Sequence, residues 1–171
     1  MGIRKAMAFT RVALAAAMIL VGVSPAAADL SLDLQCNTGA KTMQAAAKQC
    51  ATSGGMVPTA DVKRCLSTHA GDFSQTATTC VNAAENHYEA AATLTGYEAD
   101  RELIGGATYL GIAAEANIYL GRRDLATAQL NSVIKIASQV KADPHASDLV
   151  GMASSELAVA QSLLHALRTS P

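Results

Sequence analysis

The chain has 171 residues, of which 50% are hydrophobic, 16% are charged and 4% are aromatic, and it contains no tryptophan. Its 13 basic and 14 acidic residues include no basic run, so the sequence offers no binding surface for nucleic acid or for an anionic membrane. Alanine makes up about a fifth of the chain, and such small side chains favour closely packed helices over sheets.

Residues 1–28 have the features of a cleaved secretory signal. A basic start precedes an apolar stretch from Val12 to Val23, and Ala26 to Ala28 supply the small side chains that signal peptidase recognises. The stretch is too short for a membrane anchor, which needs roughly 20 apolar residues. We therefore expect cleavage near Ala28 and export to the bacterial periplasm or beyond the cell. The remaining chain then has a formal charge of about −4 and no membrane association.

The exported part, residues 29–171, is predicted to be a single all-α domain, an antiparallel helical-hairpin bundle of about six helices. Apolar residues recur at helical spacing between glycine and proline breaks. Asn37, Asp72 and Ser147 are the expected caps of the first, third and last helices. The first, second, fourth and fifth helices are expected over about 38–51, 60–70, 99–120 and 124–141. The third is expected to run from its Asp72 cap to about Leu94, and the last to follow its Ser147 cap with apolar positions from Val150 to Leu167. Gly71 is expected to end the second helix and Gly96 to stop the third.

Within the fourth predicted helix, Gly105, Gly106 and Gly111 indicate a close helix crossing, a kink or a weak point. The bundle is expected to have two parts. The helices of residues 29–96 contain all four cysteines, and residues 97–171 form the C-terminal helices.

Cys36, Cys50, Cys65 and Cys80 are expected to form two disulfides, because an exported protein meets an oxidising compartment. Cys36 cannot pair with Cys50 if the first helix is continuous, since 14 helical residues rise about 21 Å and bonded cysteines need Cα atoms within about 7 Å. Two arrangements stay open. The crossed one joins Cys36 to Cys65 and Cys50 to Cys80. The nested one joins Cys50 to Cys65 and Cys36 to Cys80, and we favour it because Cys50 and Cys65 lie symmetrically about a turn.

The cysteines show no pattern typical of a metal or redox site. Zinc ligands usually come in pairs a few residues apart, whereas these cysteines are at least 14 residues apart. The C-x-x-C motif of thiol exchange and the C-x-x-C-H motif of haem attachment are both missing. We therefore expect structural disulfides, with no metal site and no cofactor.

The positions of the four histidines do not match the pattern of a catalytic site. In the segment "ENHYE", His87 lies two residues from both Glu85 and Glu89, and such neighbours on a helix point to different faces. The other three histidines are expected to be surface or capping residues, namely His69, His145 and His165. Neither a metalloprotease, a serine hydrolase nor a phosphate-binding motif is present in the sequence. We expect no catalytic residue and a protein that is not an enzyme.

The segment "GIAAEANIYLGRRDLATAQLNSVIKIASQVKADP", residues 111–144, resembles one tetratricopeptide-type helical hairpin. The resemblance depends on Ala114, Gly121, Ala126 and Leu130. The segment departs from the family at Asn117, where an aromatic residue is usual, at Val133, which replaces a small residue, and at Pro144, which comes late. The resemblance covers one unit and implies antiparallel helix packing and a protein-binding surface.

Two functions are compatible with these patterns. The favoured one is a small exported interaction module that binds a protein or peptide partner. The alternative is a periplasmic bundle that binds a small ligand or metal with Met43, Glu85 and His87. The sequence predicts neither the partner nor the oligomeric state.

Overall fold

The computed structural model describes residues 30–54 and 60–169, and the predicted signal peptide lies outside these ranges. The described elements are α1 (Leu30–Gly54), α2 (Ala60–Thr68), α3 (Ala70–Ala92), α4 (Gly96–Tyr119), α5 (Arg123–Ala142), the short 3₁₀-helix η2 (Pro144–Leu149) and α6 (Val150–Thr169). The all-α prediction is confirmed, since the described residues form helices and turns with no strand.

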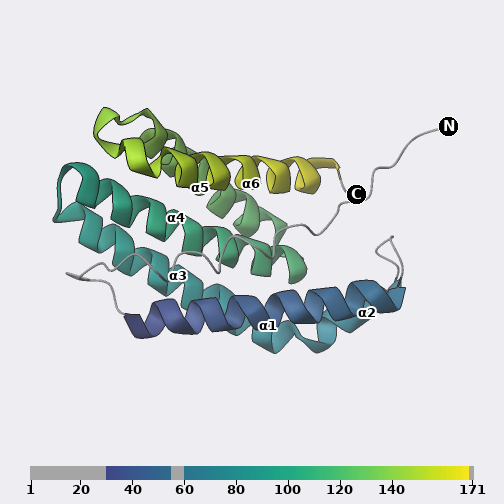
Figure 1. Ribbon diagram of the computed structural model, residues 1–171. Helices are drawn as coiled ribbons and strands as arrows, with labels where there is room; N and C mark the ends of the chain where they lie inside the picture. Colours follow the sequence, from purple (N-terminus) through teal and green to yellow (C-terminus); the bar gives the residue numbers. More distant parts are fainter. Residues whose placement is uncertain (1–29, 55–59, 170–171) are drawn as a thin grey trace.

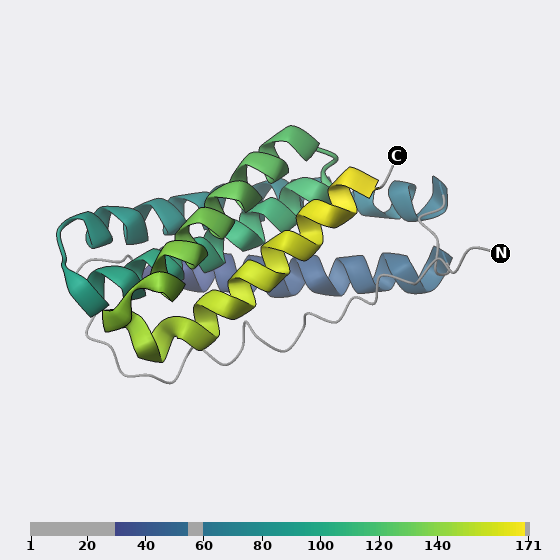
Figure 2. The same cartoon turned by 90° about the horizontal axis from the view of Figure 1, so that it is seen from above.

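The long helices run back and forth, so that neighbours in sequence pack as antiparallel neighbours in space. Figure 1 shows α1 at one edge, α3 and α4 in the middle, and α5 and α6 at the other edge. The view from above in Figure 2 shows α5 and α6 crossing at an angle on the far side of α4 from α1. The main contacts are those of α3 with α4, α4 with α5, α5 with α6 and α1 with α3. The short helix α2 continues into α3 with His69 alone between them.

The first helix starts about two turns earlier than predicted, and the predicted cap at Asn37 is wrong because that residue lies inside α1. The buried face of α1 repeats at helical steps through Cys36, Ala40, Met43, Ala47 and Cys50. Leu32 packs on the same side as Cys36, so burial extends the helix toward its N-terminus.

The boundary between the second and third helices also differs from the prediction. α2 ends at Thr68, and Gly71 belongs to the first turn of α3 and not to the end of α2. Asp72 also lies in that first turn and is not the cap of α3. Its negative charge still stabilises the N-terminus of the helix. The two helices follow each other closely because the His69 amide donates to the Leu66 carbonyl, 3.1 Å away.

Glycines with left-handed backbone angles mark both ends of α4. Gly96 has a φ of 60° and Gly121 a φ of 73°, a conformation that other residues adopt at a cost. Gly96 begins α4 and does not stop α3, which already ends at Ala92.

The last predicted cap is also wrong, because Ser147 lies within η2. Asp143 caps η2, which leads into α6, and its carboxylate accepts a hydrogen bond from the His145 amide at 2.7 Å. Pro144 follows directly, in the first position of the helical turn, where its missing amide hydrogen costs nothing.

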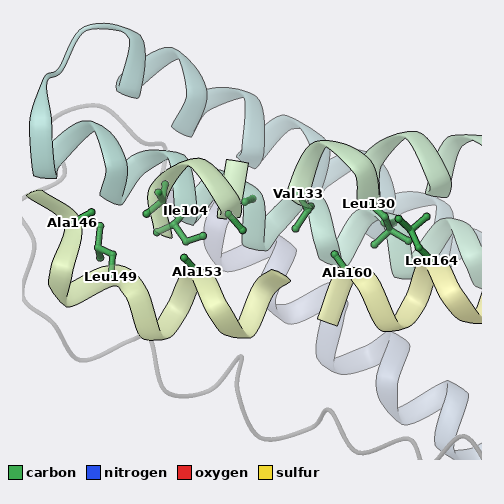
Figure 3. Close-up of a cluster of buried hydrophobic side chains, with 12 residues drawn as sticks. Ile104, Leu130, Val133, Ala146, Leu149, Ala153, Ala160 and Leu164 are labelled. Carbon is green, nitrogen blue, oxygen red and sulfur yellow. The ribbon is translucent and has the colours of Figure 1, made fainter. Parts of the chain in front are cut away.

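The largest buried cluster lies between α4, α5, η2 and α6 (Figure 3). The twelve residues of this cluster are Ile104, Ala107, Ala114, Leu130, Val133, Ala137, Val140, Ala146, Leu149, Ala153, Ala160 and Leu164. Half of them are alanines, which lets the helix axes approach closely. A smaller cluster around Met43 and Phe73 joins α1, α3 and α4.

Between α4 and α5 the interface also buries a polar pair. The Asn117 amide donates to the Gln129 side-chain oxygen at 3.0 Å, and both residues are at least 90% buried. Asn117 is the position at which the chain departs from the tetratricopeptide pattern, and Gln129 provides the partner that a buried amide needs. α4 and α5 pack against each other as an antiparallel pair.

In the described residues, none of the helices is long and apolar enough to cross a membrane.

Candidate functional site

A cluster of charged side chains joins α1, α3 and α4 around His87. Nδ1 of the His87 ring lies 2.6 Å from a carboxylate oxygen of Glu102, and Nε2 lies 3.3 Å from one of Asp33. The three side chains are only 11–15% exposed. We call this set the His87 cluster. It places an imidazole between two carboxylates, each from a different helix.

The two carboxylates favour the protonated ring. Burial on its own lowers the pKa of His87, but the hydrogen bonds and charges of Asp33 and then Glu102 outweigh it, and the pKa is raised. Arg101 lies 3.7 Å from the second oxygen of Glu102 and partly balances the remaining negative charge. An imidazolium between two carboxylates therefore ties three helices together.

Tyr109 completes the surroundings of the His87 ring from α4. The two rings are tilted by 32° with their centroids 5.2 Å apart. Burial, followed by the charge of Asp33, raises the pKa of the Tyr109 hydroxyl to about 12. The tyrosine is thus neutral and shields the ion pairs from water, which strengthens them.

Two glycines of α4 provide the space for this arrangement. A Cβ atom at Gly105 would lie 3.2 Å from Nδ1 of His87, and one at Gly106 would lie 2.4 Å from the Tyr88 ring. For Gly105 and Gly106, the close helix crossing is the correct one of the three alternatives predicted from the sequence. A Cβ atom at Gly111 would make only an ordinary contact, 3.7 Å from a carboxylate oxygen of Glu156. A Cβ atom at Gly106 would require the Tyr88 ring to shift. One at Gly105 would push the His87 ring by a few tenths of an ångström and so disturb its contact with Glu102.

Both ring nitrogens of His87 are occupied by carboxylates on opposite sides. A protonated imidazole in this position has no lone pair to accept a proton or to bind a metal. In the protonated state, the ring therefore contacts both carboxylates and joins the three helices.

The residues suggested for a small-ligand pocket do not come together. Glu85 is exposed on α3, while Met43 is fully buried against Phe73 and Ala77 in a different cluster from His87. Glu89 is also exposed, in agreement with the argument that "ENHYE" is not a triad.

The disulfides have the nested arrangement of the two that the sequence left open. Cys36 of α1 is bonded to Cys80 of α3, and Cys50 of α1 to Cys65 of α2. Cys36, Cys80 and Cys50 are fully buried, but Cys65 is partly exposed. The inner and the outer disulfide therefore differ in their access to solvent.

His69 lies beside the inner disulfide. One of its ring nitrogens and the sulfurs of Cys50 and Cys65 are all within 4.8 Å of one another. Its Nδ1 also lies 3.7 Å from a carboxylate oxygen of Asp72, and its ring packs near Phe73 with centroids 6.1 Å apart. The position at the N-cap of α3 is compatible with the expected capping location, although its side chain makes no capping hydrogen bond.

The remaining two histidines, His145 and His165, are exposed, as expected for surface residues.

Comparison of the chain with protein-family models, curated proteins and solved structures gives no match. The tetratricopeptide resemblance of residues 111–144 thus stays a prediction.

Sequence reasoning missed the His87 cluster because its carboxylates lie far from the histidine along the chain. Asp33 is 54 residues before His87 and Glu102 is 15 residues after it. The available signal was the glycine pair that follows Glu102 by one helical turn, because a close crossing at Gly105 brings the facing residue of α3 against α4.

Proposed function

We propose that the protein is an exported interaction module that binds a protein partner along the outward face of α1. This face, the outer stripe of α1, follows helical steps of four, four, three, four and three residues. Its members are all exposed and comprise Leu30, Leu34, Thr38, Lys41, Ala45 and Lys48.

The observation that supports this proposal most is the exposure of two leucines one helical turn apart. Leu30 is 63% and Leu34 is 67% exposed. Tyr97 and Leu125 are the other large apolar residues exposed in the described ranges, and they lie on separate helices. Full burial of a leucine side chain contributes about 1.5–3 kcal/mol, so covering this pair favours binding.

The charges of the stripe indicate the chemistry of the partner. Lys41 and Lys48 follow the leucines on the same face, although the exported chain as a whole is acidic. The ion pairs found in the described part of the chain involve neither lysine. A partner helix with two apolar residues and a following acidic segment matches both ends of the stripe.

Export is part of the proposal. It is supported by the signal-like pattern of residues 1–28 and by two disulfides, which persist in oxidising compartments such as the periplasm or the outside of the cell. The proposed role is binding without catalysis, in keeping with a histidine whose ring nitrogens are both paired.

Capture of partners from a periplasmic extract of the native host tests the proposal with matched variants. We expect Leu34→Glu to weaken binding of the captured protein by about tenfold or more, since an apolar contact is lost and a charge opposes the acidic partner. Leu125→Glu makes the same chemical change at a similarly exposed site on α5 and should leave capture unchanged. Equal capture by both variants, or capture of nothing by the unaltered protein, would refute the proposal.

Lys41→Glu separates the electrostatic part of the interaction. We expect this variant to bind more slowly and to lose most of the salt dependence of binding. Binding with unchanged salt dependence would show that the partner does not contact the basic end of the stripe.

A further inference from the structure

Three ligand atoms of the kind that bind zinc meet at the junction of α1, α2 and α3. They are the sulfurs of Cys50 and Cys65 and one ring nitrogen of His69, all within 4.8 Å of one another. Thiolate sulfur and imidazole nitrogen are preferred ligands of Zn²⁺, and sites with two cysteines and one histidine retain a fourth position for water. In the oxidised protein the two sulfurs are bonded to each other at 2.05 Å and are not available as thiolates.

We infer that Cys50, Cys65 and His69 form a redox-controlled site that binds Zn²⁺ when the inner disulfide is reduced. The site is separate from the outer stripe of α1 and does not depend on the function proposed for that surface.

Selective reduction is favoured by the difference in burial between the two disulfides. Cys65 is partly exposed, whereas both cysteines of the Cys36–Cys80 disulfide are fully buried. A thiol reductant attacks a disulfide sulfur directly and must reach it. We therefore expect a dithiol to open the inner disulfide first.

A dithiol is the one reactant that opening of the inner disulfide requires. The thiolate of a dithiol reductant attacks the sulfur of Cys65, and Cys50 leaves as a thiolate that takes up a proton. The second thiol of the reductant then releases Cys65 and closes the reductant's own disulfide. Binding of one Zn²⁺ to the two thiols and His69 displaces two protons from sulfur.

The remaining disulfide keeps the ligands near one another after reduction. Cys36 of α1 stays bonded to Cys80 of α3, with Cα atoms 4.9 Å apart, so α1 cannot leave α3. Cys50 is carried by α1 and His69 precedes α3 directly. On reduction the two sulfurs need to separate only to about 3.8 Å, the spacing in a tetrahedral zinc site.

With Nε2 of His69 as the metal ligand, Asp72 would lie beside the other ring nitrogen, where a metal-bound histidine usually has an outer partner. Its carboxylate lies 3.7 Å from Nδ1 of His69, on the next turn of the chain. A carboxylate next to a ligating histidine orients the ring and makes its free nitrogen a better ligand.

Graded reduction of the full chain tests the first step. The protein is treated with increasing dithiol, free thiols are alkylated, and peptides are mapped by mass spectrometry. We expect Cys50 and Cys65 to be labelled before Cys36 and Cys80, while the helical circular dichroism signal is retained. Labelling of the outer pair first, or loss of the helical signal when only the inner pair is open, would overturn the proposal.

Cobalt binding tests the second step, because Co²⁺ occupies zinc sites and reports its ligands by colour. After anaerobic removal of the reductant, we expect one Co²⁺ per chain, with thiolate-to-cobalt charge-transfer bands and the intense visible bands of tetrahedral geometry. Zn²⁺ should displace the Co²⁺, and the oxidised protein should show neither band. A selectively reduced protein without these bands would refute the site.

Variants identify the nitrogen ligand and its outer partner. His69→Ala should weaken Co²⁺ binding at least tenfold, and Asp72→Asn should weaken it about tenfold. His165→Ala removes an exposed histidine of α6 and should bind Co²⁺ as the unaltered protein does. Equal affinity in the His69 and His165 variants would show that the cation binds the thiols alone and would contradict the proposed site.

Discussion

Replacing His87 by glutamine tests the electrostatic account of the three-helix junction. Glutamine is similar in reach and keeps one donor, but it has no charge. In the variant, Asp33 and Glu102 stay 11–15% exposed with their imidazolium partner removed. We therefore expect the variant to be less stable than the unaltered protein and to keep the same helical fold.

The size of the effect follows from the number of charged contacts. A hydrogen bond to a charged group contributes about 1.5–3 kcal/mol, and removing one partner of a buried ion pair costs about 3–5 kcal/mol. The cluster retains some solvent contact and glutamine still satisfies one carboxylate, so we expect a loss of about 2–4 kcal/mol near pH 6. The free energy of unfolding of a domain is only about 5–15 kcal/mol, which makes such a loss easy to detect.

The pH dependence distinguishes charge from packing. The pKa of His87 is raised in the folded protein above its ordinary value of 6.5. The stabilisation by the imidazolium is therefore complete below about pH 6.5 and is lost as the pH rises through the folded-state pKa. The difference between the unaltered protein and His87→Gln should be largest near pH 6 and should shrink toward pH 9.

Urea unfolding at pH 6 and pH 9, followed by circular dichroism with both disulfides intact, measures the difference. His165→Gln is the control, because its ring is exposed on α6 and its loss should change stability by less than about 0.5 kcal/mol. A His87→Gln variant that is equally destabilised at both pH values would show that the ring acts by shape and not by charge.

Two further predictions concern packing against α4. Gly106→Ala should lower the free energy of unfolding in urea by about 1–2 kcal/mol, because the new methyl group meets the Tyr88 ring. Gly111→Ala on the same helix makes an ordinary contact at 3.7 Å and should be neutral or stabilising by up to about 1 kcal/mol, and a stabilised Gly106 variant would contradict the close crossing. Asn117→Ala should lower the free energy of unfolding by about 1–3 kcal/mol, because Gln129 then lacks its buried partner. The double variant with Gln129→Ala should lose less stability than the sum of the two single variants, and full additivity would argue against the hydrogen bond.

The sequence predicted the number and order of the helices because alanine-rich segments with apolar residues at helical spacing were separated by glycine or proline. Boundaries were less predictable where packing and not capping decided them. α1 extends to Leu30 because the partly buried Leu32 packs against the cluster of Cys36, Cys80, Ala83 and Ala113, whose members are far apart in the sequence and show no local pattern. Asn37 has the chemistry of a cap but lies within a helix that tertiary contacts continue.

The candidate sites were less predictable than the fold. The Cys50–Cys65 disulfide was predictable from the local pattern, because the two cysteines flank a turn predicted from two glycines and a proline. That predicted turn lies outside the described residues. The His87 cluster and the position of His69 depend instead on how helices far apart in sequence are rotated against each other. His87 is separated from Asp33 by 54 residues and from Glu102 by 15, and such separations produce no helical periodicity in the sequence. A rotation of α1 by a single residue would place Asp33 away from the histidine.

Because α4 lies in the middle of the bundle, its backbone amides should exchange with solvent last. From Ala99 to Leu120 every residue is at least partly buried, with α3 on one side and α5 on the other. Deuterium should therefore enter α4 only when the whole chain opens, whereas the short α2 should exchange through local fraying. Isotope exchange would then report the global stability from α4 and the local stability from α2, the nine-residue helix that contains Cys65.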